Sequence, residues 1–218
     1  MTAVYLESGQ KRVFACAVDW PGWCRAGRNE EQALKALAAY APRYAVVAAQ
    51  ADVKFSLTAD ARFDVVERVQ GSGSTDFGVP GVVPDLDREA LKKREAERLA
   101  SLVQACWAIF DNVVAGAPAT LRKGPRGGGR DRDKIVDHVI GAEATAYAPR
   151  IGLRLSQPAF DDAQAIAAHR AAIVETLRTA AHGRRTAADK SWPPRYAARR
   201  IAWHAMDHAW EIEDRTQF

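Results

Sequence analysis

The apolar residues alternate over short stretches near the N-terminus and recur at helical spacing over the second half of the chain. Alternation over residues 3–7 and 12–18, with Ser8-Gly9-Gln10 between them, predicts two strands joined by a hairpin. Residues 23–26 and 63–69 predict two further short strands. We therefore expect a small sheet in the N-terminal third of the chain.

A helix is expected directly after the third strand. Asn29 is a typical N-cap residue, and Gln32 occupies the glutamine position of a capping box. Leu34 and Leu37 then lie on one side of the predicted helix, which Pro42 ends or kinks. A second helical piece is expected over residues 42–51. The N-terminal part thus has the order β-β-β-α.

A breaker-rich segment divides the chain. Gly71-Ser72-Gly73-Ser74 is followed by Gly78-Val79-Pro80-Gly81, and residues of these types favour turns and linkers. We expect a module over residues 1–70, a linker over 71–87 and a second domain over 88–218. The same composition also fits an ordered flap over a C-terminal site.

Four segments with apolar stripes at helical spacing make up the second domain. Pro193-Pro194 suits the first turn of the last helix, and Gly183 suits the position after the end of the third. The predicted fold class is α+β: a small N-terminal β-β-β-α module followed by an up-down four-helix bundle. The helical segments cover residues 88–114, 132–147, 161–181 and 195–215.

The composition fits a soluble globular protein. Of 218 residues, 48% are hydrophobic and 27% are charged. No apolar run approaches the roughly 20 residues that cross a bilayer, and the N-terminus lacks a secretory pattern, so we expect a cytoplasmic protein without a membrane partner. Residues 86–218 carry 22 basic and 17 acidic side chains. That excess is small for a protein that binds duplex nucleic acid.

The three cysteines, Cys16, Cys24 and Cys106, cannot all pair, and none belongs to a close metal-ligand pair such as CxxC. The spacing of eight between Cys16 and Cys24 is too loose for a redox motif. We expect reduced, partly buried thiols.

Three histidines carry the strongest chemical signal. His204 and His208 are four residues apart, so both imidazoles project from one face of the last helix, beside Ile201 and Ile212. His138 occupies an equivalent apolar position on an earlier helix. Three inward imidazoles from two helices can hold a divalent metal and leave one coordination position open. The alternative is that each histidine is a satisfied core residue.

Other polar residues could complete such a site. Glu211, one turn beyond His208, and Glu143, on the His138 helix, could orient a ring or act as a base. His169 could be a fourth ligand, a substrate contact or a packed histidine. Arg200, with its neighbour Arg199, could hold an anionic substrate or pair with acidic residues.

Two remaining features have open interpretations. The basic, glycine-rich loop over residues 121–130 could bind an anion at the start of the His138 helix, or be a solvated loop. It is not a phosphate-binding P-loop, because no strand precedes it and the G-K-[ST] motif is absent. His182 is expected at an exposed helix end. The aromatic rings of Trp192, Trp203 and Trp210 are expected in the core or in a subunit contact.

The N-terminal part resembles the HicB-like small α+β module. The resemblance is carried by Ala17-Val18-Asp19-Trp20-Pro21-Gly22, then Gly27, then Glu30-Glu31-Gln32-Ala33-Leu34, within about 45 residues. In that family a strand ends in an aspartate and Pro-Gly, and a glycine precedes the E-E-x-A-L start of a helix. The resemblance implies an interaction or accessory role.

From residue 88 onward the chain resembles the DinB-like family of four-helix metalloproteins, which includes thiol-dependent enzymes. The matching residues are His138, within the run from Lys134 to Glu143, and His204-Ala205-Met206-Asp207-His208 on the last helix. The resemblance implies that His138, His204 and His208 bind a divalent metal such as zinc or nickel, with water completing the site. The long N-terminal addition departs from the family plan and leaves the substrate open.

Two hypotheses of function follow. The first is a metal-dependent enzyme that acts on a small-molecule substrate, as a transferase, isomerase or hydrolase that uses a low-molecular-weight thiol. The second is a non-catalytic, stress-related or regulatory binding module, in which the metal is structural and the N-terminal module recruits a partner. By the resemblance, the chain could also form a homodimer.

Overall fold

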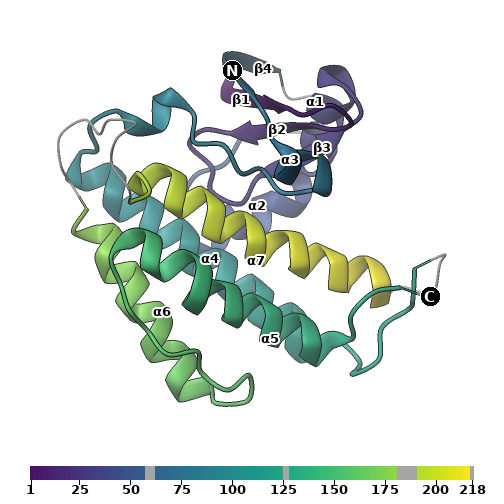
Figure 1. Ribbon diagram of the computed structural model, residues 1–218, viewed down its shortest axis with the longest axis vertical. Helices are drawn as coiled ribbons and strands as arrows, with labels where there is room; N and C mark the ends of the chain where they lie inside the picture. The colour runs from purple at the N-terminus through teal and green to yellow at the C-terminus, as the bar shows by residue number, and fades with distance from the viewer. Residues whose placement is uncertain (57–61, 125–127, 181–190, 217–218) are drawn as a thin grey trace.

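The structure is a computed structural model that describes residues 1–56, 62–124, 128–180 and 191–216. It is a mixed α+β fold, in which a four-stranded sheet formed by the N-terminal part packs against helices of the C-terminal part (Figure 1). His182 and Gly183 lie outside the described residues.

The sheet has the strand order β3-β2-β1-β4. The pairs β1–β2 and β2–β3 are antiparallel, whereas β1 and β4 are parallel, because the chain crosses over through two helices before it returns as β4. Every residue of β2 is buried, whereas β4 alternates between half-buried and exposed residues, as expected at an edge. The strands are β1 (Thr2–Ser8), β2 (Val13–Ala17), β3 (Cys24–Gly27) and β4 (Phe63–Gln70).

The crossover contains α1 (Glu30–Ala39) and α2 (Ala41–Gln50). Asn29 caps α1 as predicted, because its side chain accepts a hydrogen bond from the backbone N–H of Gln32 at 2.9 Å. Tyr40 separates the two helices, and Pro42 lies in the first turn of α2, where its missing N–H costs nothing. The apolar face of α1 packs against β2 and β3, whereas that of α2 packs against α4.

Five further α-helices lie beyond β4 in the described part of the chain. They are α3 (Gly73–Phe77), α4 (Lys93–Gly116), α5 (Arg132–Ala142), α6 (Ala163–Arg178) and α7 (Pro194–Thr216). Short helical turns stand beside them: η1 (Asp85–Arg88), η2 (Glu143–Tyr147), a π-helical turn, and η3 (Ala148–Ile151). The segment expected as one helix over 132–147 therefore changes from α-helix to π-helix at Glu143.

The four long helices do not alternate in direction. The starts of α4 and α7 lie together, where Arg195 pairs with Glu95 at 3.2 Å. α5 begins near the end of α4, where Arg132 donates to the carbonyl of Ala117. α5 and α6 both run opposite to α4 and α7 (Figure 1). The order of directions is up, down, down, up, which corrects the simple up-down order expected from the sequence.

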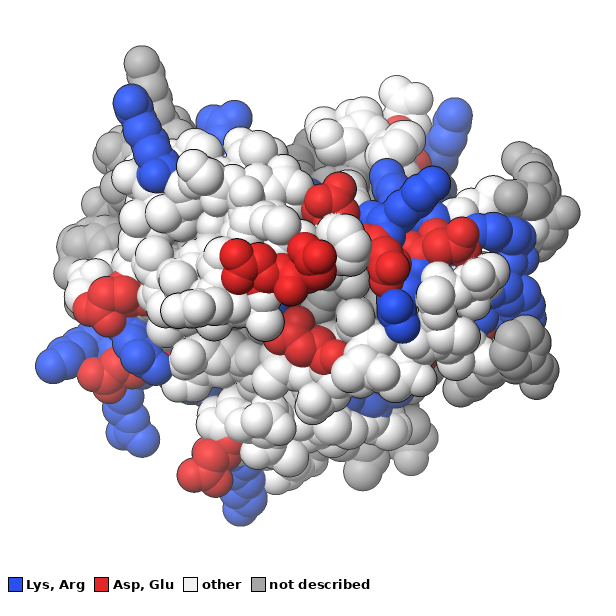
Figure 2. Space-filling model, turned by 90° about the horizontal axis from the view of Figure 1, so that it is seen from below, with Lys and Arg blue, Asp and Glu red and all other residues white. Residues whose placement is uncertain are grey.

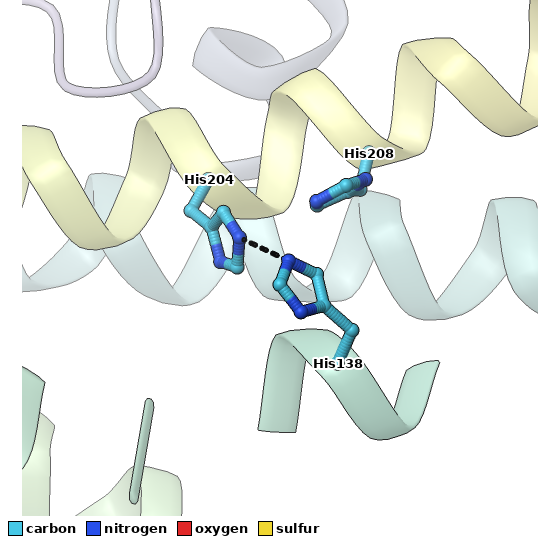
Figure 3. A group of neighbouring side chains, drawn as sticks. All are labelled: His138, His204 and His208. Carbon is cyan, nitrogen blue, oxygen red and sulfur yellow. Dashed lines mark hydrogen bonds between the residues drawn. The ribbon is translucent and has the colours of Figure 1, made fainter. Parts of the chain in front are cut away.

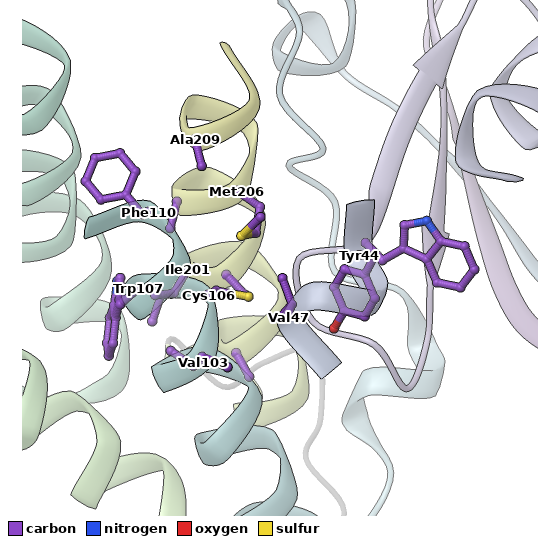
Figure 4. Close-up of a cluster of buried hydrophobic side chains, with 14 of the residues drawn as sticks. Tyr44, Val47, Val103, Cys106, Trp107, Phe110, Ile201, Met206 and Ala209 are labelled. Atoms are coloured by element: carbon purple, nitrogen blue, oxygen red, sulfur yellow. The ribbon is translucent and has the colours of Figure 1, made fainter. Parts of the chain in front are cut away.

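The N-terminal part and the helices share one hydrophobic core. Tyr44 of α2 stacks on Trp23 with ring centroids 5.6 Å apart, and its hydroxyl donates to the carbonyl of Pro21 at 2.7 Å. Cys106 of α4 and Met206 of α7 belong to the same buried cluster as Trp23 and Tyr44 (Figure 4). Burial of large apolar side chains from both parts therefore stabilises them together.

Residues 71–87, expected as either a linker or an ordered flap, pack against the sheet. The buried carboxylate of Glu7 on β1 accepts hydrogen bonds from the Thr75 hydroxyl at 2.6 Å and from the backbone N–H groups of Gly81 and Val82. Burial raises the pKa of Glu7, and these three bonds oppose that rise. Glu7 thus fastens this segment to β1.

Within the described residues, one helix, α4, is long and apolar enough by length and composition to cross a membrane. It is also the central helix of the fold, and it packs against α2, α6 and α7. Figure 2 shows a face with acidic side chains across its middle, whereas Lys and Arg gather toward the end that holds the C-terminus of α7. No continuous basic stripe crosses this face.

Candidate metal centre

Three histidines from two antiparallel helices meet in one cluster (Figure 3). His138 lies on α5, and His204 and His208 lie one turn apart on α7. Their ligand atoms lie within 4.8 Å of one another, and Nε2 of His138 lies 3.2 Å from Nε2 of His204. The structure therefore brings together the three residues that the sequence singled out.

Burial keeps two of these imidazoles neutral. His204 is buried, and burial, with the nearby His208, lowers its pKa well below the usual value. Burial also lowers the pKa of His138, and the positive charge of Arg130 adds to this effect. A neutral imidazole is the form that binds a metal, so the ligands need little deprotonation near neutral pH.

The third ring is oriented by a carboxylate. Nδ1 of His208 lies 2.8 Å from Oε2 of Glu211, whose other oxygen accepts a bond from Arg215 at 2.7 Å. Burial alone would raise the pKa of Glu211, but the hydrogen bonds from His208 and Arg215 outweigh it, and the pKa is lowered. An ionised Glu211 therefore holds the Nδ1–H of His208 and leaves its Nε2 free.

The donor set fits a divalent transition metal. Two nitrogens bound to one tetrahedral zinc lie roughly 3.3 Å apart, given zinc–nitrogen distances of about 2.0–2.1 Å. The separation of 3.2 Å between His138 and His204 matches that value. Within the described residues the cluster contains imidazoles alone, which suit zinc, nickel and copper better than magnesium or calcium. Three protein ligands leave a further position open.

Aromatic rings and one guanidinium border the cluster. The ring of Tyr147 meets that of His204 edge-on, with centroids 5.5 Å apart. The guanidinium of Arg200, one turn before His204, lies 5.2 Å from the ring centre of Tyr147 and 4.6 Å from that of Trp203. Its NH1 atom is buried and has no hydrogen-bond partner among the described residues.

Two further candidate site residues, Glu143 and His169, lie outside the histidine cluster. Glu143 begins the π-helical turn η2, and its buried carboxylate accepts bonds from Trp107 at 2.6 Å and Arg170 at 3.3 Å. It therefore faces α4 and α6 and does not orient a ligand histidine. His169 is buried on α6, next to Arg170, and is not among the clustered donors.

The remaining charged candidates have structural partners. Asp207 pairs with Arg25 of β3 at 3.1 Å, and Asp137 accepts a bond from the Gln157 amide. In the basic loop, Lys123 pairs with Asp131 at 2.5 Å. Residues 125–127 of that loop lie outside the described residues.

The tertiary arrangement adds features that the sequence analysis missed. Tyr147, the last residue of the π-helical turn η2, lies edge-on against His204. The buried Arg170, which bonds both Glu143 and Asp111, was read only as part of a helix. No sequence signal distinguishes either residue from ordinary helix positions.

No family model matches the chain, and no curated protein or solved structure matches it either.

Proposed function

We propose that the chain binds one divalent transition metal, zinc or nickel, through His138, His204 and His208. The observation that carries this proposal is the 3.2 Å separation of two facing Nε2 atoms within a cluster of three imidazoles. Neutral imidazoles at this distance can form only one N–H···N hydrogen bond, so the desolvation of buried His204 and half-buried His138 remains partly uncompensated. A metal between them would offset that cost.

The proposed activity is that of a metal-dependent enzyme on a small molecule. A divalent metal held by three imidazoles would lower the pKa of bound water, or would bind a thiolate from a low-molecular-weight thiol. His138 and His208 are half-buried, so the cluster is reachable from their side, whereas His204 is closed off. The three classes that fit this chemistry are a transferase, an isomerase and a hydrolase.

Arg200 supports an anionic substrate. Its guanidinium is fixed between Tyr147 and Trp203, and its NH1 atom is buried without a partner among the described residues. A cation positioned in this way, one turn from His204, would bind a carboxylate without moving. The rings beside it would contact the apolar body of the same molecule.

The likeness to DinB-like proteins belongs to this proposal. It is supported by the position of His138 on the second of four long helices and of the H-x-x-x-H pair on the last. In the same way, the β-β-β-α order and the Asp19-Trp20-Pro21-Gly22 turn support a HicB-like N-terminal module. That module would serve as an accessory part beside the metal site.

Substitution with cobalt(II) tests whether a coordination position is open. Cobalt follows the same ligand preferences as zinc and has visible bands that depend on coordination. The cobalt-loaded protein should change its spectrum when a small thiol is added, and Arg200→Gln should weaken the response to acetate but not to the thiol. The matched control is His169→Ala, which removes a buried histidine outside the cluster and should leave both responses unchanged.

A spectrum that stays unchanged with both probes would contradict an open site. It would favour the structural metal of the second hypothesis, in which the protein is a non-catalytic binding module.

A further inference from the structure

Two buried thiols face each other across β2 and β3. Sγ of Cys16 lies 2.8 Å from Sγ of Cys24, and both residues are almost fully buried. The two residues are direct partners in the antiparallel register. This contact belongs neither to the histidine cluster nor to a motif that the sequence analysis recognised.

The backbone hydrogen bonds place Cys16 and Cys24 at a non-hydrogen-bonded cross-strand position, where the two Cα atoms are closest. The neighbouring pair is hydrogen-bonded, because the N–H of Ala17 donates to the carbonyl of Trp23 at 3.0 Å. Bonded and non-bonded pairs alternate along an antiparallel ladder, so Cys16 and Cys24 form a non-hydrogen-bonded pair. Cα atoms of such pairs are about 4.5 Å apart, within the range that a disulfide spans.

We propose that Cys16 and Cys24 are a site of reversible oxidation, at which hydrogen peroxide converts the two thiols into a cross-strand disulfide. One thiol attacks the peroxide, becomes a sulfenic acid and releases water; the second thiol attacks that sulfur, the S–S bond forms and a second water leaves. Two thiols are oxidised while one molecule of hydrogen peroxide is reduced. A low-molecular-weight thiol reverses the step by thiol–disulfide exchange.

Little movement separates the reduced pair from the bonded one. The sulfurs need to approach from 2.8 Å to about 2.05 Å, which side-chain rotation supplies without a change in strand register. A cavity of about 10 Å³ adjoins both thiols, about the volume that admits one water molecule. Since β3 is a four-residue strand at the edge of the sheet and Cys24 is its first residue, a small local opening admits an oxidant.

Cys106 provides a matched comparison within the same chain. It is also buried and free, and burial raises its pKa, but its sulfur contacts the carbonyl of Pro21 instead of a second thiol. Burial likewise raises the pKa of Cys24. Cys106 is therefore similar in burial and differs in geometry.

The experiment uses the full chain, folded and reduced, exposed to hydrogen peroxide, then alkylated and digested without a reductant. The wild type and Cys106→Ala should lose two hydrogen atoms in intact mass and yield one linked peptide that contains Cys16 and Cys24. Their Tm should rise by about 5–10 °C and return to its starting value after reduction. Cys24→Ser should show neither the link nor the rise.

Two results would overturn the proposal. The first is that both thiols of the folded wild type stay free in excess peroxide. The second is that each sulfur gains oxygen without a link between them. Both results are measured in the wild type and in Cys106→Ala. The experiment can therefore contradict the proposal even if Cys24→Ser does not fold.

Discussion

Nε2 of His138 on α5 and Nε2 of His204 on α7 face each other at 3.2 Å, although 66 residues separate them in the chain. This contact joins two helices that run in opposite directions. It brings His138 next to the His204 and His208 pair, which the sequence presents separately. Within the described residues, His208 is hydrogen-bonded to the carboxylate of Glu211, whereas the printed hydrogen bond of His138 and His204 is the one they make with each other. One N–H···N hydrogen bond between neutral rings accounts for this contact, and the proposed metal would bring the same two nitrogens together.

Glu211 is expected to tune metal affinity without holding the fold. Replacing it in Glu211→Gln removes the negative charge that orients the ring of His208, so metal affinity should fall roughly 10–100-fold. Competition with a chromophoric chelator measures this change. Glu213→Gln is the control, because Glu213 lies two residues away and pairs with Arg43 instead. Equal affinities for the two variants would show that the Glu211–His208 contact does not act on the metal.

Arg200 is expected to matter for anions and not for the metal. Arg200→Gln should lower the affinity of the zinc-loaded protein for acetate several-fold, because a charge-assisted bond is lost. Zinc affinity itself should stay within about twofold of the wild type, since Arg200 contributes no ligand atom to the cluster. Arg178→Gln is the control, because Arg178 is exposed near the end of α6 and donates to Gln104. Isothermal titration with each ligand separates the two effects, and a loss of zinc binding alone would argue against the proposed role.

Gly22 tests the shared core. Its φ is +93°, and an added Cβ would lie 2.9 Å from Sγ of Cys106 and 3.1 Å from Cγ of Met206. Gly22→Ala should therefore destabilise the protein by roughly 2–5 kcal/mol, through backbone strain and overpacking together. Gly152 has a similar φ of +87° but no atom within 4 Å of its added Cβ. Gly152→Ala should cost only about 1–2 kcal/mol.

Urea unfolding of the two glycine variants measures both costs. Equal losses of stability would mean that the turn at Gly22 does not press against α4 and α7.

Asp87 gives a prediction for pH dependence. Its carboxyl is buried beside Arg199, and burial outweighs the attraction of Arg199 and Arg195 and raises its pKa from 3.8 to about 6. A group whose pKa is raised by folding stabilises the fold below its unfolded value, and that contribution is lost as the pH rises through the folded value. Between pH 4 and 7 the free energy of unfolding of the wild type should therefore fall relative to Asp87→Asn, by at most about 3 kcal/mol.

Urea unfolding of both proteins at several pH values measures this difference. If the wild type instead gained stability relative to Asp87→Asn as the pH rises, the ion pair with Arg199 would outweigh burial and lower the pKa of Asp87.

Local patterns predicted the elements, and long-range contacts decided how they meet. The four strands and the Asn29 cap follow from alternation and capping chemistry over a few residues. The parallel pairing of β4 with β1 joins strands that are about 60 residues apart in the chain. The docking of residues 71–87 depends on Glu7, whose three hydrogen-bond partners lie at least 68 residues away. A strand pattern alone contains no information about such partners.

In the candidate site, too, local spacing was predictable from the sequence and long-range packing was not. His204 and His208 share a face because four residues make about one helical turn, which the sequence states directly. Glu143 was expected on the same helix as His138, but α5 ends at Ala142, and Glu143 begins the π-helical turn and accepts a hydrogen bond from Trp107. A change from α- to π-helix follows from packing, and hydrophobic spacing does not predict it.

Elemental analysis of the purified, untagged protein shows whether the three histidines bind one metal ion. The wild type and His169→Ala should each hold about one equivalent of zinc or nickel, and the His204→Ala/His208→Ala double variant should hold none. Circular dichroism of each protein confirms that the helices are formed. A folded wild type that holds no metal after exposure to zinc, nickel, manganese and iron would contradict the account, as would a double variant that retains its metal.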